Sequence, residues 1–450
     1  MEGTDYFFRY LILLQYGQAQ MQPLPIGCYR WATMDEKRQI AKELSDIENC
    51  INKHHNINGH TGYILEVDIE YPEELHDLHQ DMPLAPEHIF ISKDNISPMM
   101  REYYPFGRNH KAKKLIGTLH NKKKYHVHYI LLKFYIQMGL KVTKIHRVLL
   151  FKQEPFMNDY ISHLAALRAK SSSSFEKGCL KKLANSCYGK MIEDVRKYKD
   201  VKVCRTKGEF LRASSSPFFE SFKIYSKNLV MCILRKKSVY MRSCHAIGMA
   251  ILDYSKLHMY DLYYNYILPN TRLSPVNGSI SVIMSDTDSF LFAFKGKKTE
   301  EFLEDIENVM DFSNYPSNHR LHSKEVAGHL GYLKDEMEGR AKILGAMALK
   351  AKCYSIRTDV GEDVKKCKGI PKVATKKLRY KDYKEALLRA RQLKARFHKI
   401  TSKNHIVSTT MFDRKSLSFY DDKRFYMCKI HSLPYGHFRL KNLKQCVKCQ

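Results

Sequence analysis

Two short apolar segments separated by a polar turn stand out in the second half of the chain. Residues 279–285 are rich in β-branched side chains, and residues 289–294 read Ser-Phe-Leu-Phe-Ala-Phe. Short apolar runs with a polar turn between them predict a β-hairpin. The turn carries two carboxylates one residue apart, Asp286 and Asp288, with hydroxyl residues beside them.

Helical periodicity marks other parts of the chain. In residues 175–195, Leu180, Leu183 and Ala184 form an apolar face, and Gly189 is the predicted stop. Residues 244–267 predict a long amphipathic helix that packs beneath a sheet. Further helices are expected over 33–52, 128–138 and 380–396, and strands over 62–71 and 142–151. The predicted fold class is therefore α+β.

The chemistry of the predicted turn depends on its two acids. Carboxylates this close repel each other as anions, so they favour a cation beside them. Carboxylate oxygens suit Mg²⁺ and Mn²⁺, and magnesium keeps open positions for substrate phosphates. Asp286 and Asp288 are therefore candidate metal ligands for phosphoryl or nucleotidyl transfer. The alternative is a solvated turn, because Asp and Ser are common in turns.

A second candidate group lies on the helix predicted over 175–195. Lys181, Asn185 and Tyr188 stand at i, i+4 and i+7, so they share one helical face. An ammonium can bind a triphosphate, and an aromatic ring with a hydroxyl can contact a sugar and a base. The alternative is a surface helix with a basic edge.

A third candidate group follows the hairpin. Lys350, Lys352 and Tyr354 alternate along the sequence, which predicts one face of a strand. A lysine beside a tyrosine can hold a phosphate and pack against a sugar.

The overall charge favours a polyanionic partner. The chain has 450 residues, with 76 Lys and Arg against 47 Asp and Glu, and a formal net charge of +29. Nucleic acid is the commonest partner for such an excess. In a protein that acts on nucleic acid, the basic stretch 100–125 is expected to contact phosphates; the alternative is a solvated surface. No apolar run reaches the ~18 residues of a spanning helix, and 12 scattered cysteines suggest an intracellular compartment.

The order of these motifs resembles a known family. Lys181-x-x-x-Asn185-Ser186-x-Tyr188-Gly189, then Asp286-Thr287-Asp288-Ser289, then Lys352-x-Tyr354 resemble the fingers, palm and template-primer motifs of family B DNA polymerases. The likeness is closest to the protein-primed branch of viruses, linear plasmids, organelles and large transposons. It runs from about residue 10 to about residue 440. It implies a right-hand fold with an antiparallel palm sheet, helical fingers and a mostly helical thumb.

The resemblance also implies roles for individual residues. Asp286 and Asp288 would bind Mg²⁺ or Mn²⁺, while nucleotide would contact Tyr16, Lys181, Asn185 and Tyr188. DNA would contact Lys352, Tyr354 and Gly189. The implied partners are primer-template DNA, dNTPs and a terminal priming protein. The compartment stays open between nucleus, organelle and viral factory.

The implied division of the chain has four parts. They are 1–100 (first part of the palm), 101–200 (insertion and fingers), 201–360 (second part of the palm) and 361–450 (thumb). Family members carry several hundred further residues upstream, including an exonuclease. The sequence is therefore expected to be a fragment, a mis-assembled gene model or a relic of a mobile element.

The first palm motif departs from the family pattern. Tyr16 and the turn Gln22-Pro23-Leu24-Pro25 match its second half, and counting back places Leu11 where the metal-binding Asp should be. A leucine cannot bind a cation. Asp5 offers an alternative register, whereas Asp68 is interpreted as structural.

Three functional readings therefore stay open. The first is an active DNA polymerase in which another acid replaces the missing Asp. The second is a polymerase fold that binds DNA or nucleotide without extending primers. The third, a reverse transcriptase, is a minor option because its aspartates are usually adjacent.

Two further groups are candidates for binding. Cys428, His431, Cys446 and Cys449 form a C-x-x-H…C-x-x-C pattern that could hold zinc. The alternative is that His431 belongs to the thumb and the cysteines are unliganded. Arg147 is a weaker candidate for a phosphate pocket.

Overall fold

The candidate hairpin belongs to a four-stranded antiparallel sheet. The computed structural model describes residues 6–13, 15–46, 60–103, 113–241, 243–269, 279–295, 299–361, 363–403 and 405–441. The sheet has the order β11 (Ser279–Ser285), β12 (Ser289–Lys295), β1 (Tyr6–Leu13) and β13 (Leu333–Asp335). Its aromatic residues are buried: Phe290 and Phe292 are 0% exposed and stack at 5.1 Å between ring centroids. The predicted hairpin is confirmed.

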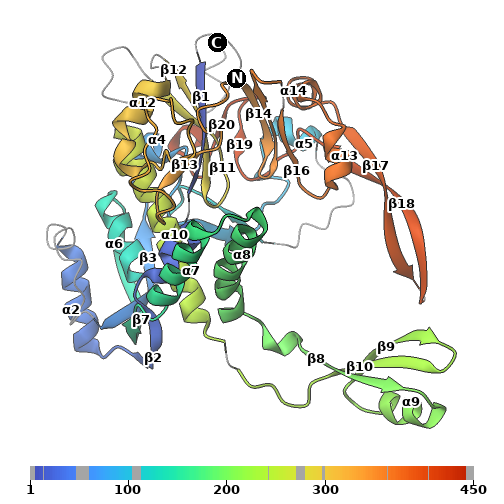
Figure 1. Ribbon diagram of the computed structural model, residues 1–450. Helices are drawn as coiled ribbons and strands as arrows, with labels where there is room; N and C mark the ends of the chain where they lie inside the picture. Colours follow the sequence, from blue (N-terminus) through green and yellow to red (C-terminus); the bar gives the residue numbers. More distant parts are fainter. Residues whose placement is uncertain are drawn as a thin grey trace.

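A second four-stranded sheet lies below the first (Figure 1). Its order is β2 (Leu24–Trp31), β7 (Lys141–Glu154), β3 (Thr61–Glu70) and β6 (Lys122–His128). The strands expected over 62–71 and 142–151 are β3 and β7. Helix α2 (Met34–Ser45) packs at β7 and starts with a capping box between Thr33 and Glu36.

The predicted long helix connects the two sheets. It is α10 (His245–Asp261), which continues as a π-helical turn over Leu262–Ile267. Tyr263 of that turn stacks on Phe290 at 6.2 Å, and Tyr260 stacks on Phe134 of α6 (Tyr129–Gln137) at 6.4 Å. One continuous hydrophobic core therefore holds both sheets and both helices, as the apolar pattern predicted.

Three helices stand beside this core. They are α1 (Gln15–Met21), α7 (Asn158–Lys170) and α8 (Ser174–Met191). The serine run ends as a cap, because the Ser173 hydroxyl accepts from the Glu176 N–H at 3.5 Å. Helix α10 approaches α8 closely at Gly248, where a Cβ would lie 1.9 Å from Cγ2 of Ile192. This contact fixes α8 against the core.

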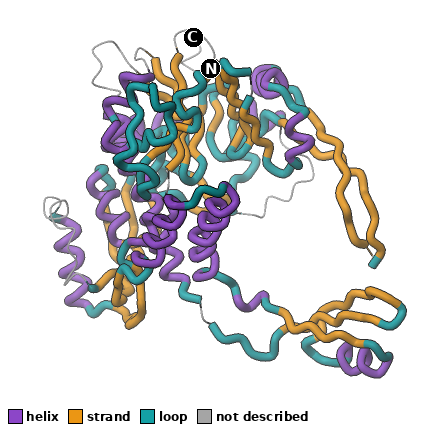
Figure 2. Tube along the Cα trace, in the orientation of Figure 1, coloured by secondary structure: helices purple, strands orange, loops and turns teal. Residues whose placement is uncertain are grey.

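Residues 199–235 form a separate small sheet. Its order is β8 (Lys199–Cys204), β10 (Leu229–Arg235) and β9 (Phe219–Ser226), with α9 (Lys207–Ser214) against it. Cys204, Ala213, Cys232 and Leu234 make its own small core. This sheet projects away from the body (Figure 2), within a range that was expected to belong to the palm.

The C-terminal part contains more strand than predicted. A three-stranded sheet of β14 (Ile343–Lys350), β15 (Cys353–Thr358) and β16 (Val364–Cys367) leads to α13 (Lys372–Lys376) and α14 (Tyr380–Leu388). A long ribbon of β17 (Leu393–Lys403) and β18 (Ile406–Leu417) follows. At its tip, His405 stacks on Phe222 of β9 at 5.3 Å.

The expectation of a mostly helical thumb, with a helix over 380–396, is therefore wrong for the described residues. Helix α14 ends at Leu388, and Ala390 has a left-handed φ of +53° that α-helix does not allow. The next residues are rich in Ile, Val and Thr, which prefer strands because their branched side chains fit a pleated surface.

The remaining elements are short. They are α4 (His76–His79), β4 (Glu87–Ile89), α5 (Pro98–Glu102), β5 (Lys114–Ile116), α12 (Thr299–Asp305), β19 (Phe425–Tyr426) and β20 (Ser432–Leu433), with 3-10 turns at Glu73–Leu75, Val195–Lys197, Glu307–Val309 and Phe438–Lys441. Among the described residues, no helix combines the length and apolar character needed to span a bilayer.

Candidate active site

The two acids sit at the tip of the β11–β12 hairpin. The turn is closed by backbone hydrogen bonds from the Asp286 N–H to the Ser289 C=O at 3.0 Å and from the Asp288 N–H to the Asp286 C=O at 2.7 Å. Thr287 between them has a left-handed φ of +63°. Its hydroxyl lies 3.3 Å from Oδ1 of Asp286. The turn therefore presents both carboxylates from a fixed backbone.

A second hairpin turn meets the first. Lys350 pairs with Cys353 across the β14–β15 hairpin, so Lys352 lies in the turn, with a φ of +61°. The expectation that Lys350, Lys352 and Tyr354 share one strand face is wrong, because the turn interrupts the alternation. Lys352 Nζ lies 3.1 Å from Oδ1 of Asp286. The turn therefore places the Lys352 ammonium beside the carboxylate of Asp286.

Burial and nearby charges both act on the pKa of Asp288. Burial raises the pKa of Asp288 above its ordinary value, and the negative charge of Asp286 raises it further. The positive charges of Lys181 and Lys352 act in the opposite direction. Lys352 thus contacts the hairpin turn, and the charge of Lys181 on α8 also acts on Asp288.

Helix α8 carries the second candidate group, of which Lys181 acts on Asp288 through its charge. Lys181 and Asn185 are exposed, whereas Tyr188 is half-buried among Ala184, Cys187 and Met191. Of the predicted apolar face, Ala184 packs against the core and Leu180 is half-buried, whereas the prediction is wrong for Leu183, which is 46% exposed.

Gly189 does not stop this helix, which continues to Met191. A Cβ at Gly189 would meet no protein atom within 4 Å. The surface of α8 at this residue is therefore open to an approaching molecule.

Tyr354 faces away from the site. It is 3% exposed and packs with Met284 and Leu291 behind the hairpin. A contact between its ring and a DNA sugar would need this cluster to open. In the structure Tyr354 supports the β11–β12 hairpin from below.

The strand that carries Leu11 pairs with the hairpin and has no carboxylate at that position. Leu11 of β1 pairs with Phe290 of β12 on one side and with Asp335 of β13 on the other. Asp5 lies outside the described residues, as does the side chain of Tyr16, whose backbone belongs to α1. The strand pairing thus puts Leu11, which stands where the sequence pattern calls for an Asp, directly beside the hairpin strand β12.

Sequence reasoning missed Glu336. Partial burial raises its pKa, and Asp335 and Glu338 raise it further, whereas Lys181 lowers it. Lys181 therefore acts on the carboxyl groups of both Glu336 and Asp288. The signal in the sequence was the acidic pair Asp335-Glu336, which stands shortly before the lysine-rich third motif.

Asp68 lies in the second sheet and is fully engaged there. It accepts from the Lys124 N–H at 2.8 Å and contacts His146 Nε2 at 2.9 Å. These two contacts lower the pKa of Asp68 to about 2. Arg147 is similarly engaged, because its Nε donates to Glu66 at 2.7 Å. Neither residue is directed at the hairpin acids.

Several basic side chains of the stretch 100–125 are engaged in contacts within the protein. Lys122 is 1% exposed and donates to Glu87 at 2.7 Å, and Lys114 pairs with Asp422. Arg101 donates to the Asp94 C=O at 2.8 Å. The expectation of phosphate contacts is therefore wrong for Lys122, and residues 104–112 lie outside the described part.

The donor set can be tested against the expected metals. In the described part of the chain, no group of three or more His, Cys, Asp or Glu side chains is placed to hold a metal ion. Mg²⁺ commonly binds through one or two carboxylates and completes its shell with water and substrate phosphates. The Asp286/Asp288 pair matches this mode of Mg²⁺ binding. Of the zinc candidates, Cys428 Sγ lies 3.3 Å from His431 Nδ1, while Cys446 and Cys449 are outside the described residues.

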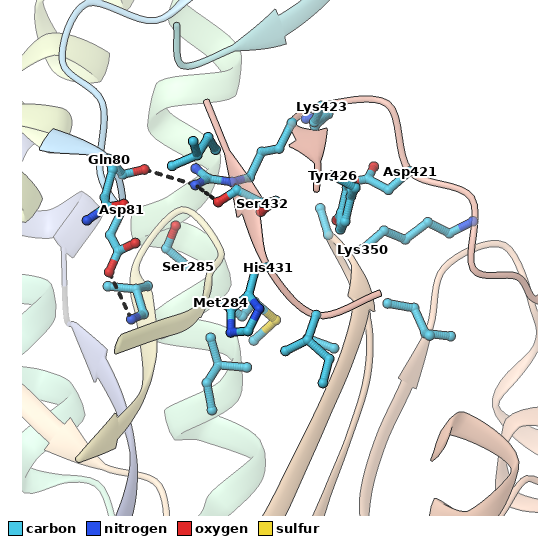
Figure 3. Close-up of a pocket in the computed structure, with 18 of the residues that line it drawn as sticks. Gln80, Asp81, Met284, Ser285, Lys350, Asp421, Lys423, Tyr426, His431 and Ser432 are labelled. Carbon is cyan, nitrogen blue, oxygen red and sulfur yellow. Dashed lines mark hydrogen bonds between the residues drawn. The ribbon is translucent and has the colours of Figure 1, made fainter. Parts of the chain in front are cut away.

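A cavity of about 510 Å³ lies behind the hairpin (Figure 3). Its walls come from β11, β14 and the segment after β18, and they include Ser285 and Lys350. Arg424 braces the wall by donating to the Gln80 C=O at 3.0 Å and to the Ser432 hydroxyl at 2.9 Å. Lys350 therefore lines this cavity, whereas Lys352 in the next turn pairs with Asp286.

Comparison with known proteins identifies the fold. No protein-family model and no curated protein sequence matches the chain. Among solved structures, Phi29 DNA polymerase in complex with primer-template DNA and incoming nucleotides matches 92% of this chain at a TM-score of 0.50 and 13% identity. The chain spans 57% of the length of that polymerase.

Proposed function

We propose, from the fold that this chain shares with Phi29 DNA polymerase, that it is a DNA-directed DNA polymerase that adds nucleotides to a primer terminus. The observation that carries the proposal is the contact of Lys352 with Asp286 at a turn that holds two carboxylates, with the charge of Lys181 also acting on Asp288. The solved relative holds primer-template DNA and incoming nucleotides, which supports the same partners here.

Each side chain receives a role in this proposal. Asp286 and Asp288 would hold Mg²⁺ or Mn²⁺, which lowers the pKa of a primer 3′-hydroxyl and stabilises charge on the phosphates. Lys181, exposed on α8, would pair with the triphosphate of the incoming dNTP. Asn185, Tyr188 and Tyr16 would contact the rest of the nucleotide.

DNA would bind beside these groups. Lys352 would pair with a phosphate of the primer-template, and the open surface at Gly189 would allow close approach of the duplex. The formal net charge of +29 favours this polyanion.

A second function is favoured by one observation, the position of Leu11. A two-metal mechanism draws carboxylates from more than one element, and Leu11 supplies none although its strand pairs with β12. The alternative is a polymerase fold that binds DNA and dNTP without extending primers.

Primer extension separates these two functions. Purified wild type, Asp286→Asn and Leu11→Asp would be supplied with primer-template, dNTPs and Mg²⁺ or Mn²⁺. The proposed activity predicts extension by wild type and at least about a 100-fold loss in Asp286→Asn. Extension by Leu11→Asp alone would show that the natural chain does not extend primers because position 11 lacks a carboxylate. If none of the three extends a primer, the polymerase proposal fails.

A further inference from the structure

The ion pair between Lys352 and Asp286 is placed where it can exchange partners. Lys352 Nζ lies 3.1 Å from Oδ1 of Asp286, and the two side chains are 54% and 26% exposed. Ion pairs with this exposure are weak, because water and salt compete with them. A stronger anion or a stronger cation can therefore displace either member.

The backbone on both sides of the pair is fixed. The Lys352 C=O accepts from the Lys368 N–H at 3.0 Å, which ties the turn to the end of β16. The Asp286 N–H donates to the Ser289 C=O at 3.0 Å within the other turn. Exchange therefore needs only rotation of the long lysine side chain, which has four flexible carbons.

Each member of the Lys352–Asp286 ion pair also has a competing partner. A divalent cation at the hairpin needs the carboxylate of Asp286, and the Lys352 ammonium competes with that cation for the same oxygen. A phosphate of nucleic acid attracts the Lys352 ammonium and so competes with Asp286 for it. The two binding events are therefore linked through one side chain.

We propose that Lys352 occupies Asp286 in the DNA-free protein, and that a phosphate of bound primer-template draws Lys352 away and frees Asp286 for a divalent cation. This inference rests on the proposed function for the identity of the polyanion. By thermodynamic linkage, the cation must strengthen DNA binding by the same factor as DNA strengthens cation binding.

The first test needs only the metal and the DNA-free protein. Mn²⁺ affinity would be measured by electron paramagnetic resonance for wild type, Lys352→Met and Lys350→Met. Lys350 is a matched control because it stands on the same hairpin, two residues away, but lines the cavity behind it (Figure 3). Lys352→Met is expected to bind Mn²⁺ about fivefold more tightly than wild type.

The controls decide whether the gain is local. Lys350→Met should keep the wild-type affinity, and adding Asp286→Asn to Lys352→Met should abolish the gain. Equal Mn²⁺ affinity in wild type and Lys352→Met overturns the inference. An equal gain in Lys350→Met overturns it as well, because the effect would then be general electrostatics.

The second test adds a primer-template oligonucleotide. After correction for Mn²⁺ bound by the DNA alone, DNA should raise the Mn²⁺ affinity of wild type about fivefold and leave that of Lys352→Met unchanged. A DNA effect of equal size in both proteins overturns the inference. Primer extension is scored separately: linkage without extension overturns only the proposed polymerase, and extension without linkage overturns only this inference.

Discussion

Asp68 and Asp288 belong to two neighbouring sheets, and their surroundings shift the pKa of the two carboxyl groups in opposite directions. Asp68 accepts from the Lys124 backbone and contacts His146, which lowers its pKa to about 2. Burial and the neighbouring Asp286 raise the pKa of Asp288. A carboxylate with fixed partners stabilises the fold, whereas one that depends on side-chain cations is available to a ligand.

The largest expected difference between the two aspartates is in catalysis. Asp288→Asn should reduce primer extension by about 10²–10³-fold, because it removes one of two hairpin carboxylates. Asp68→Asn should leave the specific activity of folded protein within about twofold of wild type. Steady-state extension rates of both variants, normalised to folded protein, check this. Equal losses would show that Asp68 also belongs to the active site.

A smaller difference is expected when the cationic partners are removed. Lys181→Met should weaken dNTP binding by about 10–100-fold, since a charge-assisted contact to phosphate is lost. His146→Gln, at the partner of Asp68, should leave dNTP binding unchanged. Equilibrium binding of a labelled dNTP measures both, with Lys182→Met as the control for a neighbouring lysine. A comparable loss in Lys182→Met would remove the special role of Lys181.

The smallest effects are on stability, and they should have opposite signs. At pH 7, Asp68→Asn should lower the melting temperature and Asp288→Asn should raise it, each by about 2–4 °C. The stabilisation by Asp68 is present above its unfolded pKa and is lost as pH falls through about 2. The cost of Asp288 is absent below its unfolded pKa, grows as pH rises from that value, and is complete above its elevated folded pKa.

Thermal denaturation between pH 3 and pH 7 checks both signs. Asp288→Asn should converge toward wild type at the acidic end of this range, whereas Asp68→Asn should still be less stable than wild type at pH 3, because Asp68 is neutralised only as pH falls through about 2. Shifts of the same sign in the two variants would contradict the comparison.

Local patterns in the sequence predicted the elements that carry the site. Apolar residues run without interruption through β12 after a polar turn, and this run matches a strand buried on both faces, with Phe290 and Phe292 in one cluster and Leu291 and Ala293 in another. The long helix α10 was predicted from the same kind of signal, because its apolar residues recur at helical spacing.

Other features depended on tertiary contacts that no local pattern contains. Lys352 continues an alternating pattern, yet it occupies a turn with a φ of +61°. A tyrosine can lie either at the surface or in a core, because its side chain is amphipathic. Tyr354 lies in the core because it packs in a cluster with Met284. The ribbon of β17 and β18 was missed because charged residues in it also suit a helix.

The two turns of the site share a backbone conformation that has a consequence for any library of variants. Thr287 and Lys352 both hold a left-handed φ, of +63° and +61°, which costs a side-chain-bearing residue about 1 kcal/mol relative to glycine. Selection for heat resistance alone would therefore favour glycine at both positions. Such a screen would enrich well-folded molecules that have lost the hydroxyl beside Asp286 and the ammonium that pairs with it.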